Sequence, residues 1–549
     1  MPENQPASIA ELPKLIDEGG SERDAGCPLP PGFEQIGKVV CWEGTPNFLD
    51  VAAVLDPRSD VRPGQFVGVW HGKRGHAVLT VVQVANCRDV NPNEEPVLSV
   101  ARERLGLGTA YASEGISTRI HRLMEGPTVE ELELEISNGA VKSKGAASAV
   151  ERLIRAGDPV VLLTDDLIAE TIGSLPNPDD GLHIGEVYGE RPIQVTLDPQ
   201  AVQMHVGIFG NPGKGKSYSS GVIMEEALQW GIPTLILDIN GEMIAAARSL
   251  GGLILTLPDP SFGLSLSLIT SAELLQVAPN IQEGTIYAEL IELAHDRLRG
   301  ERNGRPFTFA DLVAKIREIG QQTDAKMPSI NTAVSRILAL EHDPVVGGNF
   351  DFVQAVVKHR LVVLDCRYLT LRQTRLIAAA AARELQRVGR EMARKAEAGD
   401  KSAANWFSIF MVDEAHQVAP SDEGVVSSQV MFELARMGRH VRTGLVLISQ
   451  SPADLNLSVL KRLQLRFIFA LEKDQLRAIQ GVMADLDERL VAKLPKLPRG
   501  VCGVSGSSEL VRHGFLMRVR KRKTPVGGTT PKVFAGRTKT PLSTARQPT

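Results

Sequence analysis

The sequence lacks several features that would point to particular classes of protein. It has no run of about 18 apolar residues, which a transmembrane helix requires, and its first residues are polar and acidic rather than a secretory signal. Aromatic residues make up only 5% of the 549 residues, which argues against a broad base-stacking surface for single strands. These absences favour a cytoplasmic protein without a membrane segment.

Cysteine is also scarce, and its five positions follow no pattern. Cys27, Cys41, Cys87, Cys366 and Cys502 form no C-x-x-C pair and no zinc-ligand spacing. This scatter indicates a reducing compartment and structural thiols that pack as small hydrophobic residues.

Charge is distributed unevenly along the chain, although the net charge is only −4. Residues 512–549 contain ten Lys or Arg and no acid, whereas the preceding residues carry 51 basic and 65 acidic side chains, a net charge of −14. The sequence therefore predicts a basic C-terminal tail at 512–549. Such a tail either contacts nucleic acid, contacts an acidic neighbouring subunit, or stays solvated.

The N-terminal part of the chain divides into two predicted regions. Residues 1–32 are rich in Pro, Gly and acids, and we expect them to be flexible. Residues 33–198 contain short β-type runs such as KVVCW, DVAAVL and AVLTVVQV between turn residues, which is typical of a small barrel or sandwich. The clearest helical stretch in this region is Ala147–Ala156.

From residue 199 to 511, strands alternate with helices, which is the pattern of a parallel α/β sheet. The apolar runs VGIF, PTLILDI, RLVVLDC, IFMVDE and GLVLIS each end in polar residues, where ligands bind in open α/β sheets. A helical insertion is predicted at about 268–345. The fold class is therefore α/β, preceded by a small β-barrel.

Residues Gly210–Ser217 fit the phosphate-binding pattern G-x-x-x-x-G-K-[ST]. The backbone N–H groups of the turn and the following helix N-terminus would cradle phosphates, Lys216 would reach the β- and γ-phosphates, and the Ser217 hydroxyl would join the Mg²⁺ shell. The sequence thus predicts ATP and Mg²⁺ as cofactors. The candidate nucleotide-binding residues are Gly210, Asn211, Pro212, Gly213, Lys214, Gly215, Lys216, Ser217 and Tyr218.

Asp413 and Glu414 end the apolar run IFMVDE. In nucleotide hydrolases the first carboxylate holds Mg²⁺ and the second polarises the attacking water, so Asp413 is the candidate metal ligand and Glu414 the candidate catalytic residue. The segment Asp413-Glu-Ala-His416 is also typical of DEAH-box helicases. However, about 195 residues separate Ser217 from Asp413, which is too many for that family.

Further polar residues complete the candidate catalytic set. Gln450 follows the strand GLVLIS and either senses the γ-phosphate or lies in solvent. Glu242 follows the second strand, where the segment Asp238–Glu242 places more carboxylates at the same sheet edge. Three arginines, with Arg439 as the first choice, either form a solvated face or supply an arginine finger across a subunit boundary. They are Arg436, Arg439 and Arg442.

Together these motifs resemble the HerA family, within the HerA/FtsK branch of P-loop motor ATPases. Asp238-Ile-Asn-Gly-Glu-Met243 is similar to the family motif D-x-x-G-E-[YF], with Met243 in place of the aromatic residue, and Asn211-Pro212 departs from the commoner loop TGSGKS. The other similar segments are His205-Val-Gly-Ile-Phe-Gly, Val412-Asp-Glu-Ala-His416, Ala435-Arg-Met-Gly-Arg439, Gly444–Leu455 and Leu497-Pro-Arg-Gly500.

The resemblance implies a RecA/FtsK-like core, a HerA–ATP-synthase barrel before it, and a homohexameric ring around double-stranded DNA with ATP at the subunit boundaries. It also implies a NurA-like nuclease or, for some bacterial members, a defence effector as partner. The predicted function is therefore an ATP-driven double-stranded DNA translocase or helicase in DNA end processing or anti-phage defence.

Two alternatives stay open beside this function. One is an ATPase scaffold that assembles and regulates a partner nuclease or NAD-consuming effector. The other is a conjugative transfer motor, which the lack of a membrane segment disfavours. A group of arginines, Arg297, Arg299, Arg302 and Arg305, is a candidate pore loop, although a solvated surface loop accounts for it better.

Overall fold

The computed structural model describes residues 29–527 except 31, 42–44, 57–58, 72–76, 90–121, 138–139, 190, 283, 422–423 and 484. The described residues form two compact units. The first unit contains those up to Ile232 together with Ala381–Lys521, and the second contains Pro233–Ala380 together with 522–527. Nearly all of the predicted segment 1–32, and residues 528–549 of the predicted tail, lie outside the described residues.

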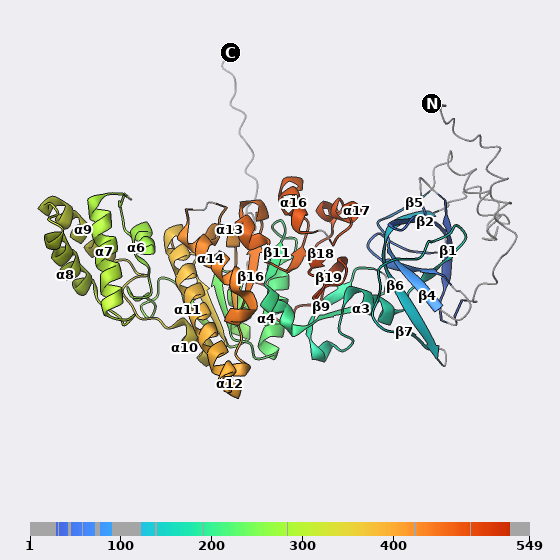
Figure 1. The fold of residues 1–549 in the computed structure, drawn as a ribbon, viewed down its shortest axis with the longest axis horizontal. Helices are drawn as coiled ribbons and strands as arrows, with labels where there is room; N and C mark the ends of the chain where they lie inside the picture. Colours follow the sequence, from blue (N-terminus) through green and yellow to red (C-terminus); the bar gives the residue numbers. More distant parts are fainter. Residues whose placement is uncertain are drawn as a thin grey trace, which may run out of the picture. The chain divides into compact units, whose positions relative to one another are not determined.

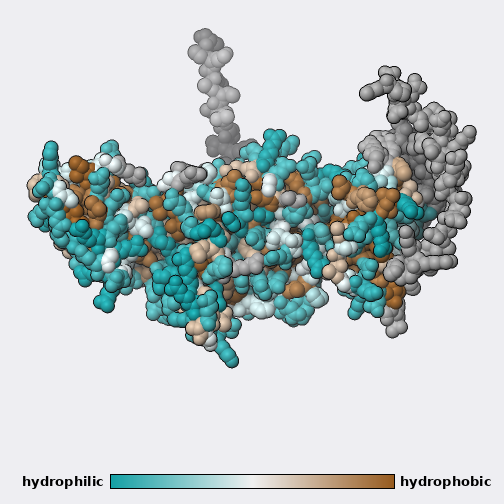
Figure 2. Space-filling view, in the orientation of Figure 1, coloured by the Kyte–Doolittle hydropathy of each residue, from teal (hydrophilic) through white to brown (hydrophobic). Residues whose placement is uncertain are grey.

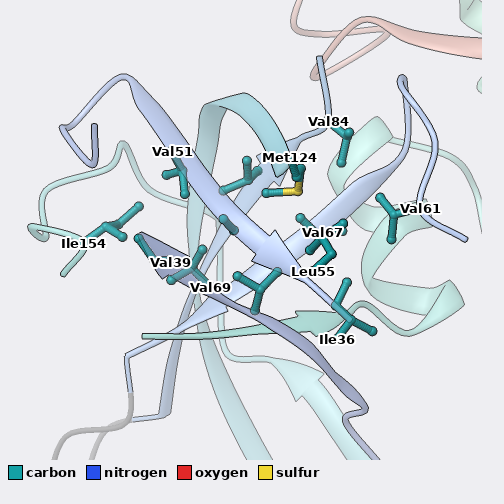
Figure 3. Packing of buried hydrophobic residues seen from close by; sticks show 13 residues of the cluster. Ile36, Val39, Val51, Leu55, Val61, Val67, Val69, Val84, Met124 and Ile154 are labelled. Carbon is teal, nitrogen blue, oxygen red and sulfur yellow. The ribbon is translucent and has the colours of Figure 1, made fainter. Parts of the chain in front are cut away.

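The first unit begins with the closed antiparallel barrel that the sequence predicted (Figure 1). Its strands follow the order β2-β1-β8-β3-β4-β6, and β6 pairs back with β2. The strands are β1 (Gln35–Val40), β2 (Asp50–Leu55), β3 (Phe66–Trp70), β4 (Ala77–Gln83), β6 (Arg122–Ser137) and β8 (Pro159–Leu162), with β5 (Asn86–Asp89) and β7 (Ala140–Ser143) attached to β6. Buried aliphatic side chains such as Val39, Val67 and Met124 fill its interior, as Figure 3 shows.

The helix predicted at Ala147–Ala156 is wrong, because these residues form no helix. Ser148 instead exchanges two backbone hydrogen bonds with Glu131 of β6. The Glu131 carboxylate also accepts hydrogen bonds from the backbone N–H groups of Glu151 and Arg152. These donors are therefore held by β6 and are not available to a helical ladder.

A mixed sheet forms the rest of the first unit, with strand order β10-β9-β19-β18-β17-β11-β16-β15, and the pairings from β10 to β17 are antiparallel. Strands β15, β16, β11 and β17 are parallel and buried along their whole length, as expected for a sheet covered on both faces. The strands are β9 (Leu182–Val187), β10 (Gln194–Leu197), β11 (Val206–Phe209), β15 (Ser408–Val412), β16 (Thr443–Ser449), β17 (Leu465–Ile468), β18 (Val501–Gly506) and β19 (Phe515–Val519). The helices are α3 (Asp165–Ile172), α4 (Lys216–Gln229), α12 (Lys401–Ala404), α13 (Ala415–Val418), α14 (Val426–Met437), α15 (Leu457–Leu460), α16 (Lys473–Ile479), α17 (Glu488–Val491) and the C-terminal part of α11 (Leu371–Glu397).

Two predicted boundaries are wrong, because strands from both sides of the ATP-binding region complete this sheet. Strands β9 and β10 lie within the region predicted as barrel, 33–198, and β19 lies within the predicted tail, 512–549. Strand β9 pairs with β19, with Val187 opposite Met517 and Gly185 opposite Val519. The barrel therefore ends at β8, and the tail begins only after β19.

The second unit contains the parallel strands β12 (Thr234–Asp238), β14 (Leu361–Asp365) and β13 (Leu253–Thr256), in that order. Its helices are α5 (Ile244–Ser249), α6 (Ser271–Val277), α7 (Ile286–Glu301), α8 (Phe309–Gln322), α9 (Met327–Leu340) and α10 (Phe352–His359), with the N-terminal part of α11. Helices α6 to α9 lie within the residues predicted as a helical insertion. Helices α6 and α8 each begin with a capping box, at Thr270 and Thr308.

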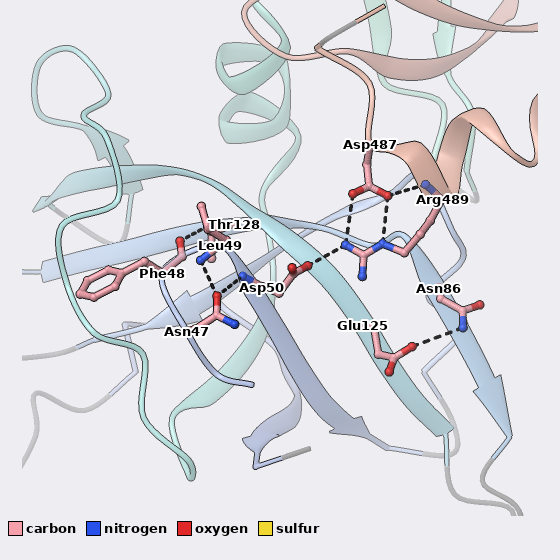
Figure 4. Close-up of polar contacts among 9 residues, drawn as sticks. All are labelled: Asn47, Phe48, Leu49, Asp50, Asn86, Glu125, Thr128, Asp487 and Arg489. Atoms are coloured by element: carbon pink, nitrogen blue, oxygen red, sulfur yellow. Dashed lines mark hydrogen bonds and ion pairs between the residues drawn. The ribbon is translucent and has the colours of Figure 1, made fainter. Parts of the chain in front are cut away.

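Polar contacts connect the barrel with α17 and with the loops around β18 and β19. The guanidinium of Arg489 donates to the carboxylate of Asp50 in β2, at 2.6 Å, and also to Asp487 (Figure 4). The side chain of Gln83 donates to the carbonyl of Gly514 at 2.8 Å. Lys493 donates to the carbonyl of Ala85, and His513 contacts Glu130 at 3.1 Å.

The face drawn in Figure 2 is mostly hydrophilic, and its hydrophobic residues are scattered in small groups. Within the described ranges, no helix has the length and apolar composition needed to cross a membrane.

Candidate nucleotide-binding site

The strand register brings the predicted nucleotide residues to one edge of the first unit's sheet. Phe209 at the end of β11 lies opposite Ser449 at the end of β16, and Val412 at the end of β15 lies opposite Leu447. The residues that follow these strands, including Gly210 and Gln450, therefore share the carboxyl edge where ligands bind in such sheets. The backbone N–H of Gly210 also donates to the carbonyl of Ser449.

The loop between β11 and α4 has the backbone geometry of a phosphate cradle. Gly215 has a φ of 131°, and a Cβ atom there would lie 3.0 Å from the ring of Phe469, so only glycine fits. Gly215 is also the N-cap of α4, and no side chain among the described residues caps this helix, in contrast to α6 and α8. Its first N–H groups are thus placed for an anion. Lys216 is buried in the first turn, whereas Ser217 and Tyr218 are half-buried.

Residues that the sequence did not single out support this loop. The N–H of Asn211 donates to the carbonyl of Ala470, and its side-chain amide donates to Glu472 at 3.1 Å. The N–H of Gly500 donates to the carbonyl of Lys214 at 2.9 Å. The segment Leu497-Pro-Arg-Gly500, noted above only for its resemblance to a family motif, therefore has a structural role beneath the loop.

Asp413 and Glu414 follow β15 and are both buried, with 2% and 7% of their surface exposed. Glu414 has φ 45° and ψ 49°, a left-handed conformation that is uncommon for a residue with a long side chain. Nδ1 of His416 lies 3.1 Å from the Ser449 hydroxyl and 3.5 Å from the Glu414 carboxylate. His416 thus links the end of β15 with the end of β16, a contact that sequence spacing alone does not reveal.

The three candidate arginines lie at the other end of the sheet. Met437 ends α14, and the short helix η3 (Gly438–Val441), which contains Arg439, leads directly into Thr443 at the start of β16. Arg442 donates to the carbonyls of Ala403 and Ala404, which end α12. Arg436 is exposed and pairs with Glu433 at 2.8 Å. Arg436 and Arg442 therefore both have partners in their own chain.

Glu242 belongs to the second unit, in the turn that follows β12. There the buried carboxylate of Asp238 accepts hydrogen bonds from the N–H groups of Gly241, Glu242 and Met243, at 2.8, 3.1 and 2.8 Å. Burial raises the pKa of Asp238 to about 6, although these donors act in the opposite direction. Asp238 thus holds the turn, and a catalytic role of Glu242 stays a prediction.

The arginines of the candidate pore loop belong to the second unit. Arg302 pairs with Asp311 at 3.2 Å, and Arg297 donates to the side chain of Gln322. These exposed contacts favour the interpretation of a solvated surface loop.

The residues present fit ATP and Mg²⁺. A glycine-rich cradle, a helix N-terminus without a side-chain cap and a buried lysine suit the phosphates, while a hydroxyl and a carboxylate are ligands that Mg²⁺ prefers. No cluster of three His, Cys, Asp or Glu with metal-binding geometry occurs in the described part of the chain.

Comparison with known proteins gives a consistent result. Residues 182–385 match the family model of the helicase HerA central domain, and this match begins at the first residue of β9. A probable helicase of Methanocaldococcus jannaschii is 22% identical over 364 residues, covering 64% of this chain and 69% of the relative. The DNA double-strand break repair helicase HerA of Sulfolobus acidocaldarius is 22% identical over 392 residues, covering 68% and 75%. Among solved structures, VirB4 of Thermoanaerobacter pseudethanolicus aligns with a TM-score of 0.47 and 13% identity, covering 63% of this chain and 98% of that one.

Proposed function

Because residues 182–385 match the family model of the helicase HerA central domain, we propose that this chain is a HerA-type ATPase that moves along double-stranded DNA. The observation that carries the proposal is the shared edge at which the phosphate loop, Asp413, Glu414 and Gln450 follow neighbouring parallel strands. This arrangement has the parts that phosphoryl transfer requires, in a chain whose relatives include DNA repair helicases.

Each residue of this edge has a proposed role. Lys216 and the N–H groups of the loop bind the β- and γ-phosphates, and Ser217 and Asp413 hold Mg²⁺. The bound Mg²⁺ supplies positive charge that neutralises the phosphates during transfer. Glu414 orients the attacking water and accepts its proton, and Gln450 donates to a γ-phosphate oxygen.

We propose that Arg439 serves the nucleotide of a neighbouring subunit in a homohexameric ring. Its segment precedes β16, whereas the phosphate loop lies beyond the far end of this strand. The seven residues of β16 span about 20 Å, a separation that favours action in trans. The cytoplasmic setting and a nuclease or defence-effector partner are part of the same proposal.

The test combines DNA stimulation with mixed rings. Duplex DNA is expected to raise the ATPase rate, and its binding should weaken steeply with salt because it depends on phosphate contacts. Mixing Arg439→Ala subunits with Glu414→Gln subunits, each strongly impaired but with a measurable residual rate alone, should restore hydrolysis at boundaries where both residues are intact. An intact hexamer whose ATPase rate is the same with and without DNA would favour the scaffold alternative. An Arg439→Ala ring with full ATPase activity would show that Arg439 has no role in hydrolysis.

A further inference from the structure

One buried histidine connects the strand that leads into the phosphate loop with the helix that leads into the arginine segment. His205 directly precedes β11, and only 2% of its surface is exposed. The backbone N–H of Leu445 in β16 donates to its Nδ1 at 2.9 Å, and its Nε2 lies 3.1 Å from the carbonyl of Ala435 in the last turn of α14.

The two contacts define the state of the ring. Because Nδ1 accepts a hydrogen bond, the proton of the neutral imidazole lies on Nε2, which donates to Ala435. The ring thus uses both nitrogens and joins β16 to α14. The backbone of His205 has φ 61° and ψ 139°, a sparsely populated conformation that the surrounding contacts must maintain.

The His205 imidazole lies close to the segment that contains Arg439. Ala435 lies three residues before Gly438, and a Cβ atom at Gly438 would come 3.5 Å from Nε2 of His205. Arg439 follows immediately. In the other direction, the four residues of β11 lead from His205 to Gly210 of the phosphate loop.

We infer that His205 is a positioning residue for Arg439: its imidazole holds the end of α14 so that the arginine segment keeps a set position relative to the phosphate-loop strand of the same subunit. The inference rests on the proposed role of Arg439. It adds a route by which the nucleotide state of one subunit reaches the arginine that the subunit presents to its neighbour.

The experiment measures nucleotide affinity, KM and kcat for ATP in the full-length protein carrying His205→Ala, His205→Gln, Arg439→Ala or the double change His205→Ala with Arg439→Ala. His205→Ala should lower kcat about 10- to 100-fold with nucleotide affinity and KM within about threefold of wild type, the size expected when a reacting group is misplaced. His205→Gln retains a donor and an acceptor and should recover most of kcat. Exposed His342 provides the control, and His342→Ala should match wild type.

The double variant decides whether His205 acts through Arg439. If it does, the double change is no slower than Arg439→Ala alone, within about twofold, since the arginine has nothing left to lose. Three results would overturn the inference while leaving the arginine role intact. In the first, the losses of kcat from the two single changes multiply in the double variant. In the others, His205→Ala loses as much nucleotide affinity as it loses kcat, or it keeps a normal kcat. A normal kcat in Arg439→Ala would instead contradict the proposed function itself. If His205→Ala does not fold, as judged by thermal melting, His205→Leu, which fills the space but makes neither hydrogen bond, replaces it in both arginine backgrounds.

Discussion

At the end of β15, the carboxylates of Asp413 and Glu414 lie at the edge that carries the phosphate loop, whereas at the end of β12 the carboxylate of Asp238 is occupied by three backbone N–H groups of its own turn. Both are apolar strands that end in an acidic residue. In the second unit, Asp365 at the end of β14 is also engaged, by a bidentate pair with Arg367 at 2.8 Å. The strand pattern is therefore the same in both units, and what differs is the backbone after the strand: the turn after β12 directs three N–H groups at Asp238, whereas β15 ends beside β16, the neighbour of the strand that leads into the phosphate loop.

The largest effect should follow from changing the first of these edges. Glu414→Gln is expected to lower the ATPase rate about 10³-fold while nucleotide still binds, because the amide cannot accept the proton of water. Lys216→Ala should lose nucleotide binding itself, since its ammonium contacts the phosphates before the reaction. Fluorescent-nucleotide titration and phosphate release distinguish the two. Near-normal turnover by Glu414→Gln would remove it as the catalytic residue.

A change at the second edge should affect stability first. Asp238→Ala leaves three backbone N–H groups, one buried and two half-buried, without their acceptor and should lower the free energy of unfolding by about 3 kcal/mol. Asp238→Asn keeps one acceptor oxygen and should lose less. Thermal melting of both variants measures this, and an Asp238→Ala protein that melts like wild type would contradict the structural role of Asp238.

Lowering the pH should decrease the stability of the first unit and increase that of the second. Burial lowers the pKa of His205 in the first unit to about 4 and raises that of Asp238 in the second to about 6. Stability from neutral His205 is present above its unfolded pKa of 6.5 and is lost as pH falls toward 4. Asp238 behaves conversely, because its protonated form is favoured in the fold, so its contribution is lost as pH rises from 3.8 to 6. Each difference of about two pKa units corresponds to about 3 kcal/mol.

Hydrogen exchange resolved by unit measures this between pH 4 and 6.5. His205→Gln should remove the acid sensitivity of the first unit, and Asp238→Asn should remove the opposite slope in the second. Equal slopes in wild type and variants would show that other groups control the pH response.

The smallest expected losses of stability come from replacing glycines, one of them in the turn after Asp238. Gly241 has φ 75°, and a Cβ atom there would lie 2.6 Å from the guanidinium of Arg367, whereas Gly251 has φ 74° with nothing within 4 Å. Gly251→Ala should therefore cost only the conformational penalty of about 1 kcal/mol, and Gly241→Ala about 1 kcal/mol more. Melting temperatures compare the pair, and equal losses would mean that Arg367 moves aside freely.

The local parts of the site could be predicted from the sequence. The glycines of the phosphate loop, the apolar strand before them and the helix after them lie within about twenty residues, so one stretch of chain determines the whole motif. The barrel was also predictable, because its strands alternate with turn residues at short intervals.

Contacts between distant parts of the chain could not be predicted in this way. Strand β9 pairs with β19 across more than three hundred residues, and neither strand carries a signal of its partner. Strand β19 was also hidden by the basic composition of its surroundings. Arg520, which counted toward a basic tail, is buried and paired with Glu225 and Glu226 of α4, at 2.9 and 2.6 Å. Its charge belongs to the interior of the first unit.

The contacts of Arg489 with the barrel have a mechanical consequence. Arg489 donates a hydrogen bond to Asp50 of the barrel. Eleven residues later, the N–H of Gly500 donates to the carbonyl of Lys214 in the phosphate loop. A force on the barrel would therefore be transmitted through residues 489–500 to Lys214 of the phosphate loop. This route does not include the chain that joins β8 to β9. The residues from Arg489 to Gly500 would then respond both to force on the barrel and to nucleotide bound at the phosphate loop.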